Sequence, residues 1–357
     1  MVNSASAVKE QRPSLRSSGS LGPARPRHAL LLRLVETREL GILFLLLLVV
    51  IGTTLVQPRF WGLATLRNVL LWIPLLAVVA MGQMMVIITR GIDVSVGSIV
   101  GVVGMAVGIL FRDVPWFSIP LGVLCSLLFG LVFGSLNGAL ISWARIPAVI
   151  VTLGGMSAYR GLAFILAGPA GSQIDSNELP TELIRWSQVG PFGLWLIPWL
   201  VIITLGIAGL TYLFLRYTTT GRNIYALGSN PEAARMRGVP VERVTFVVYA
   251  FTGAMAGLAG LLYASRFGFV NPGQTGVGLE LTVIASVVIG GVAVFGGSGS
   301  VVGVLLGCLL LGTINVALAV LGVPGTWKLA VYGFVIVFAV TLDALLHRQL
   351  RRAIGGG

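Results

Sequence analysis

Residues 215–244 read LRYTTTGRNIYALGSNPEAARMRGVPVERV and form a polar, strongly basic stretch between two long apolar segments. Within it, Ser229, Asn230, Pro231 and Glu232 are typical of a helix start, because a capping Ser or Asn precedes Pro and Glu in the first turn. Glycine and proline at positions 238 and 240 would end this helix after about one or two turns. The stretch therefore predicts a short helix in a basic loop that connects two apolar segments.

This loop has two interpretations. In membrane proteins that change conformation, a rigid helix between two spans can transmit movement from a soluble partner. Alternatively, the loop is a solvated connection whose arginines only set the orientation of the chain in the membrane.

The composition indicates an integral membrane protein. Of the 357 residues, 56% are hydrophobic and 10% are charged, whereas a soluble chain carries about 25% charged residues. The net charge of +12 lies mostly in loops and tails, which indicates topology within a lipid bilayer and argues against a nucleic-acid partner. Cys125 and Cys308 fall in apolar runs, so they indicate small core residues and predict neither a disulfide nor a metal site.

Apolar segments predict an all-α polytopic fold of about ten transmembrane helices. We expect them at residues 40–56, 69–89, 99–111, 119–143, 148–167, 195–215, 244–264, 279–295, 301–321 and 328–346. They would form one transmembrane domain, residues 40–346, between basic tails at 1–39 and 347–357. Most Lys and Arg residues fall on one side if the N-terminus is inside, so we expect both termini and the central loop in the cytoplasm.

Two short segments predict an inverted repeat. Residues 134–140, GSLNGAL, resemble residues 312–318, GTINVAL, and the two lie in spans that are expected to run in opposite directions. A shorter match between residues 97–101 and 299–303 gives a different alignment. The longer match agrees with the number of spans and is preferred.

Glycines also recur at intervals of four residues. Gly130, Gly134 and Gly138 follow this spacing in one span, and Gly253 and Gly257 follow it in another. Small residues at this spacing let helix backbones approach closely in a membrane. The pattern predicts a tightly packed bundle and carries no information about a substrate.

Few polar side chains lie in or next to the expected spans: Gln83, Asp93, Asn137, Arg160, Glu280 and Asn315. Of these, Gln83, Asp93, Asn137 and Asn315 are the candidates for a substrate pathway. Asp93 could instead cap the following helix at the membrane surface, and the two asparagines could instead bond between helices. No buried acids and histidines suggest a proton relay, and no residue set suggests a catalytic site, a cofactor site or a metal site.

Motifs along the chain resemble a known family when they are taken together. They are TGRN at 220–223, GSN at 228–230, AAR at 233–235, TRGIDVSVGS at 89–98, IPA at 146–148, TLG at 152–154, IGG at 289–291 and GGSGS at 296–300. This set resembles ABC importer permeases of the ribose, xylose and rhamnose branch, over about residues 35–346. Within the branch, GFVNPGQTGVGLE at 268–280 looks most like autoinducer-2 import permeases, and rhamnose permeases come second.

The resemblance implies a permease subunit in the bacterial inner membrane that translocates a small sugar or sugar-like solute. It also implies ATP-binding subunits, a periplasmic solute-binding protein and a second permease chain, either a copy of this one or a different one. The ATPase-coupling loop would comprise Gly221, Arg222, Gly228, Asn230, Ala233, Ala234, Arg235 and Gly238. An ion-coupled secondary transporter is the alternative, although intramembrane acids are scarce; a membrane scaffold is a further alternative that the repeat argues against.

Overall fold

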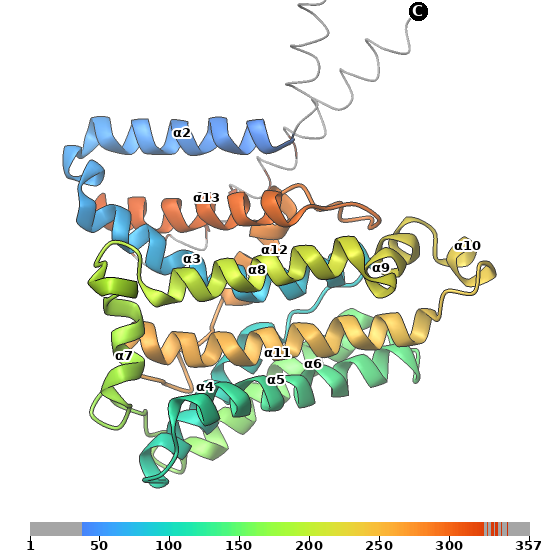
Figure 1. Cartoon of the computed structure of the whole chain (residues 1–357), viewed down its shortest axis with the longest axis horizontal. Coiled ribbons are helices and arrows are strands. Elements are labelled where there is room, and N and C mark those ends of the chain that lie inside the picture. Colours follow the sequence, from blue (N-terminus) through green and yellow to red (C-terminus); the bar gives the residue numbers. More distant parts are fainter. Residues whose placement is uncertain are drawn as a thin grey trace, which may run out of the picture. The chain divides into compact units, whose positions relative to one another are not determined.

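The computed structural model describes residues 38–324 and, beyond them, Trp327, Ala330, Val331, Gly333, Phe334, Val337 and Thr341. The expected tails at 1–37 and 347–357 and most of the expected last span lie outside the described residues. The long helices are α2 (Arg38–Val56), α3 (Leu63–Ile88), α4 (Val96–Asp113), α5 (Ile119–Ser142), α6 (Ala148–Ala167), α8 (Trp199–Tyr217), α11 (Val241–Phe267) and α13 (Val301–Val320) (Figure 1). Shorter helices are α7 (Thr181–Gln188), α9 (Thr219–Ser229), α10 (Pro231–Met236) and α12 (Leu279–Ile289), with 3-10 turns η1 (Pro58–Trp61) and η2 (Pro191–Gly193).

The helical, polytopic fold class is confirmed. Among the described residues, 8 helices are long and apolar enough to cross a membrane. The described residues form no β-strand; two of them, Ile174 and Val270, pair in an isolated antiparallel bridge. The first seven expected spans and the ninth each correspond to one of these long helices, with ends that differ by a few residues.

At the eighth expected span, residues 279–295, the helix is shorter than the apolar run that predicted it. The helix α12 has 11 residues, which at 1.5 Å per residue gives about 16 Å, roughly half of a hydrocarbon core. It ends because Gly290 and Gly291 follow; Gly291 takes the left-handed conformation with φ 87°. The N–H of Val292 then bonds back to the carbonyl of Val287 (3.2 Å). Apolar composition alone could not reveal this turn.

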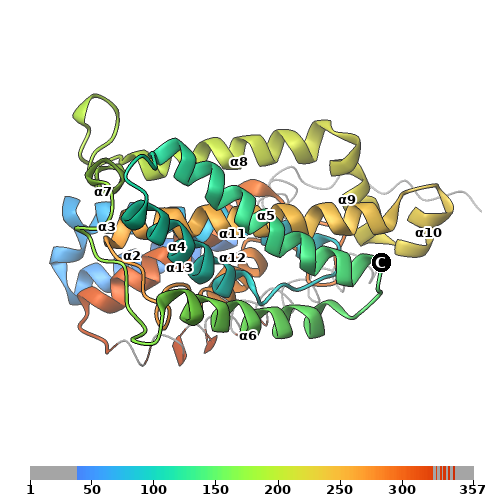
Figure 2. The same cartoon turned by 90° about the horizontal axis from the view of Figure 1, so that it is seen from below.

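Close glycine contacts join α5 to α11, which lie side by side (Figures 1 and 2). A Cβ on Gly134 would stand 2.8 Å from the Cα of Gly253, and a Cβ on Gly130 would stand 2.9 Å from the Cα of Gly257. Real Cβ atoms do not approach backbone so closely. The spacing of four residues therefore brings the two backbones into contact, as the sequence predicts.

The helix pairings bear on the expected repeat. The repeat would equate α3 with α11 and α5 with α13. In the structure, α5 packs on α11, and α13 packs on α3. If the two halves are equivalent, the pair α5–α11 in one half must have the counterpart α13–α3 in the other. The observed pairs agree with this requirement, and the repeat stays a prediction.

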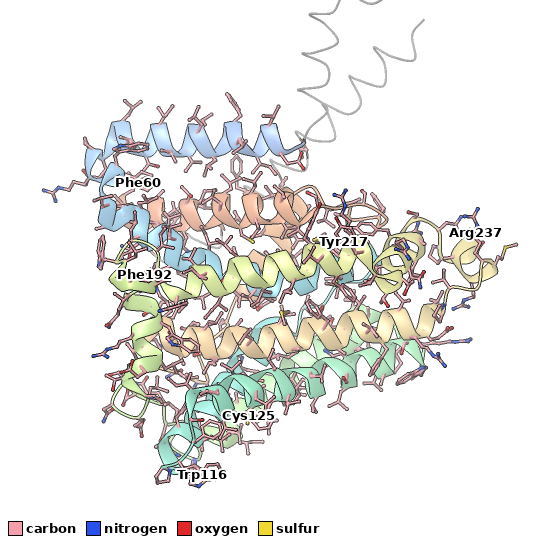
Figure 3. The ribbon with its side chains drawn as sticks, viewed as in Figure 1. Phe60, Trp116, Cys125, Phe192, Tyr217 and Arg237 are labelled. Carbon is pink, nitrogen blue, oxygen red and sulfur yellow. The ribbon has the colours of Figure 1, made fainter. Side chains whose placement is uncertain are left out.

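The bundle has two distinct ends. The helix α10 extends beyond the neighbouring helices in both views (Figures 1 and 2), and Arg237 marks this α10 end in Figure 3. Phe60, Trp116 and Phe192 lie toward the opposite end (Figure 3). We call the latter the aromatic end.

Candidate functional site

A cavity of about 340 Å³ lies between α3, α11, α12 and α13. The last turn of α11 and the first turn of α12 contribute to it, so it lies in the half of the bundle nearer the aromatic end. Three of its residues are aromatic, and three others carry a neutral amide or hydroxyl group; among the described residues the rest of the lining is aliphatic or glycine. The aromatic residues are Trp72, Tyr263 and Phe267, and the polar ones are Gln274, Thr282 and Asn315.

The aromatic residues pack against one another. The ring centroids of Trp72 and Phe267 are 6.0 Å apart in an edge-to-face arrangement, and those of Tyr263 and Phe267 are 4.4 Å apart. Aromatic surface beside a few amide and hydroxyl groups suits a small, neutral and partly polar solute. A charged solute would find no countercharge in the described lining, and burying an unpaired charge is costly.

The loop at residues 271–278 forms one wall of this cavity and is held by Arg160 of α6. One guanidinium nitrogen of Arg160, Nη1, donates to the carbonyls of Pro272 (2.9 Å) and Thr275 (2.7 Å). The other, Nη2, donates to the carbonyl of Gly97 in α4 (3.3 Å). Arg160 thus joins α4, α6 and the loop, a positioning role that the sequence did not indicate because the three segments are far apart in the chain.

Three of the four pathway candidates meet in a buried polar cluster. One carboxylate oxygen of Asp93, Oδ1, accepts bonds from the N–H (2.8 Å) and hydroxyl (2.7 Å) of Ser95. The Ser95 hydroxyl accepts from Nδ2 of Asn137 (2.8 Å), and Oδ1 of Asn137 accepts from the Tyr159 hydroxyl (2.8 Å). In the amide orientation that matches donors with acceptors, the side-chain nitrogen of Gln83 donates to the carbonyl of Asp93 (3.2 Å), and its side-chain oxygen accepts from the N–H of Asp93 (3.2 Å).

This cluster holds α3, α4, α5 and α6 together. Gln83, Asp93 and Asn137 are each at most 1% exposed, and none of them lines the cavity. Ser95 is the N-cap residue of α4, but its side chain makes no capping bond to the helix and donates to Asp93 instead. The capping interpretation is therefore not confirmed, and both residues lie inside the protein rather than at its surface. Asn315 is the one pathway candidate that the structure places at the cavity.

Two capped helices make up the basic loop. The hydroxyl of Thr218 accepts a bond from the N–H of Gly221 (3.0 Å) and begins α9. The side chain of Asn230 accepts from the N–H of Ala233 (3.0 Å) and begins α10. The predicted short helix is therefore confirmed, whereas α9 was not expected, because its threonines and glycines resemble a loop.

The coupling candidates divide into those that shape the loop and those that face outward. Gly221 and Gly228 are buried against neighbouring backbone, and Gly238, with φ 80°, ends α10. Ala234 is 4% exposed, and its carbonyl accepts a bond from the N–H of Val239 (3.1 Å). Ala234 therefore supports the loop from within.

The outward-facing candidates are Arg222, Asn230 and Arg235, with Ala233 half-buried beside them. Arg235 donates to Glu242 (2.9 Å), and both side chains are exposed. Such surface pairs contribute little to stability. Ala233 is thus the small residue of α10 that a partner surface can reach.

Met236 is a further candidate that the sequence analysis missed. It ends α10 and is 88% exposed, next to Arg237 at the tip of the α10 end (Figure 3). A flexible apolar side chain on a projecting helix is well suited to fill a cleft of a protein partner. A single methionine between two arginines carries no periodic signal, so the sequence pattern did not single out this residue.

Comparisons with known proteins agree with this architecture. A family model described as "Branched-chain amino acid transport system / permease component" matches residues 65–340, and the chain belongs to this family of membrane permeases. It is 37% identical over 328 residues to "Autoinducer 2 import system permease protein LsrC" of Photorhabdus luminescens, covering 90% of this chain and 95% of that protein. A protein of the same name from Escherichia coli O9:H4 (strain HS) is 37% identical over 317 residues, covering 89% and 90%. No solved structure matches.

Proposed function

We propose that this chain is the permease subunit of an ATP-driven importer for a small, neutral, sugar-like solute. Autoinducer-2 is the first candidate, and rhamnose or another monosaccharide is the next. The proposal is carried by the cavity, whose described lining is aromatic and polar but uncharged. The name shared by the similar proteins supports the choice of autoinducer-2.

The uncharged lining bears directly on the solute. The family description mentions branched-chain amino acids, which carry an ammonium group and a carboxylate at neutral pH. Each charge would need a partner once it left water, and Gln274, Thr282 and Asn315 offer only neutral groups. A hydroxylated ring can instead stack on Trp72 or Tyr263 and bond to these groups.

Energy would come from partner subunits through the basic loop. ATP-binding subunits would dock on α10, with Met236 in a cleft and Ala233 allowing close approach. Hydrolysis of ATP takes place on those subunits, and this chain is not itself an enzyme. A second permease chain, identical or different, would complete the membrane part.

The location follows from the same assignment. The chain would lie in the bacterial inner membrane, with the α10 end and both termini in the cytoplasm. A periplasmic solute-binding protein would deliver the solute at the aromatic end, on the side of the cavity.

Uptake of labelled autoinducer-2 tests the proposal. Cells would contain this chain with its ATP-binding, solute-binding and second permease partners, and control cells would lack only this chain. We expect uptake that depends on the chain and that excess unlabelled leucine does not reduce. Leucine uptake that depends on the chain would overturn the proposal that the solute is neutral. Uptake of rhamnose or ribose alone would keep the class of solute but replace autoinducer-2 as the candidate.

A further inference from the structure

Three chain segments meet at the α10 end around Arg90. The guanidinium of Arg90 donates to the carbonyl of Gly228 through Nε (2.7 Å) and to the carbonyl of Ser229 through Nη2 (2.7 Å). Nearby, the N–H of Gly297 donates to the carbonyl of Ile88 (3.0 Å). We call residues 88–90, 228–229 and 296–297 together the joint.

The glycines of the joint leave no room for side chains. A Cβ on Gly296 would lie 2.7 Å from the carbonyl oxygen of Ile88 and 2.9 Å from that of Gly228. A Cβ on Gly297 would lie 2.9 Å from the Cα of Ser229. The three segments are therefore in backbone contact, and a shift of one must displace the others.

Arg90 supplies the two side-chain hydrogen bonds of the joint described above, and its own backbone geometry is unusual. Its φ is 67°, a left-handed conformation that is uncommon for a residue other than glycine and that persists where surrounding contacts enforce it. Its two acceptors are among the last carbonyls of α9, which lack partners within the helix and carry partial negative charge. A forked guanidinium holds both carbonyls in a fixed planar geometry, which the flexible point charge of a lysine does not reproduce.

The joint connects α10 to the cavity. Asn230 directly follows the joint and caps α10, so α10 and the end of α9 are joined by a single residue. On the other side, α3 runs from Ile88 at the joint to Leu76 and Trp72 at the cavity, about 18 Å from Ile88 to Leu76 at 1.5 Å per residue. The helix α13 begins four residues after Gly297 and reaches the cavity at Asn315.

We infer that Arg90 is the positioning residue that transmits movement of α10 to α3 and α13, and so to the cavity. This inference rests on the proposed function, in which a partner moves α10. Arg90 pulls on α3 when the end of α9 shifts, because both of its bonds point to that end. The contact of Gly297 with Ser229 carries the same shift to the start of α13.

A reconstituted complex tests the inference. The full chain and its partner subunits would be placed in proteoliposomes, and uptake of autoinducer-2 and hydrolysis of ATP would be measured on the same sample. The variants are Arg90→Gln, which removes the charge and the fork, and Arg90→Lys, which keeps the charge. Arg145→Gln is the matched control, because Arg145 is also an exposed arginine with positive φ (55°) at the α10 end.

We expect the uptake per ATP hydrolysed to fall about tenfold in Arg90→Gln, less in Arg90→Lys, and by less than about twofold in Arg145→Gln. The ATP-binding subunits should stay bound in all three variants. An unchanged ratio in Arg90→Gln would overturn the inference. Loss of the ATP-binding subunits from this variant, or an equal fall in uptake and hydrolysis, would also overturn it.

The wild-type complex separates this inference from the proposed function. If wild type hydrolyses ATP but imports neither autoinducer-2 nor a monosaccharide, the proposed function fails and the inference fails with it. If wild type imports the solute, only the ratio measured for the Arg90 variants decides the inference.

Discussion

Gly134 of α5 and Gly253 of α11 are in backbone contact, so that a Cβ added to Gly134 would stand 2.8 Å from the Cα of Gly253. In contrast, a Cβ added to Gly154 of α6 would meet no atom within 4 Å outside its own helix backbone and chain neighbours. Two glycines in helices of the same membrane domain therefore differ in what an added methyl group would meet.

We expect Gly134→Ala to destabilise the folded protein by about 1–3 kcal/mol, because the two backbones must separate. Gly154→Ala should leave stability unchanged or raise it slightly, since alanine favours a helix over glycine. Thermal unfolding in detergent measures both effects. A melting temperature for Gly134→Ala equal to that of Gly154→Ala would show that the α5–α11 contact is not tight.

Docking at α10 can be tested by adding negative charge. Met236→Asp and Ala233→Glu should leave insertion intact, because both residues lie outside the spans, but should abolish retention of the ATP-binding subunits by desolvation and clash. Ala144→Glu, at an exposed alanine between α5 and α6, adds the same charge as a control. Co-purification at matched expression is the measurement; full retention in Met236→Asp would rule out α10 as the docking helix.

Ala234, which the resemblance also places in the coupling loop, is a poor site for a test of docking. Its 4% exposure means that a glutamate there would disturb the loop itself as well as any partner contact. A loss of transport in such a variant would not distinguish docking from misfolding.

Asn137 and Asn315 should behave differently although the expected repeat equates them. Asn137→Ala would remove the bonds to Ser95 and Tyr159 and leave the Tyr159 hydroxyl with only a long bond to the carbonyl of Phe133 (3.4 Å), so we expect a loss of about 1–3 kcal/mol in stability. Asn315→Ala should instead reduce uptake by about tenfold, which corresponds to the loss of one hydrogen bond to the solute. Trp116→Ala, at an exposed site outside the cavity, is the control. Reversal of these two phenotypes would contradict the placement of the cavity.

The orientation predicts accessibility from the two sides of the membrane. In a Cys125→Ser background, Arg222→Cys should react with an impermeant thiol reagent only in inverted vesicles, and Glu178→Cys should react only in intact spheroplasts. The opposite pattern would place α10 outside the cell, where ATP-binding subunits could not reach it.

Local features were predictable where the chemistry is local. Asn230 followed by Pro231 and Glu232 predicts α10 correctly, because a cap and its helix are adjacent in sequence. The glycines of α5 and α11 predict tight packing because their spacing of four residues can be read within each helix. Apolar runs predict where most helices lie, but α12 ends at a glycine pair inside such a run.

The cavity could not be predicted, because its residues are distant in the chain. Trp72, Phe267 and Asn315 come from three helices, and nothing in the local pattern around each of them marks a shared surface. Gln83, Asp93 and Asn137 were grouped with Asn315 only because all four are polar and lie in or beside a span. Their separation into a sealed cluster and a cavity wall depends on helix packing.

Dependence of uptake on ATP tests the central claim most directly. Proteoliposomes would contain this chain, its ATP-binding subunits and a second permease chain, with the solute-binding protein and labelled autoinducer-2 on the opposite side from ATP. We predict uptake that requires ATP, persists when ionophores collapse proton and sodium gradients, and disappears in Met236→Asp. Uptake by this chain alone, driven by an ion gradient without ATP, would contradict the account.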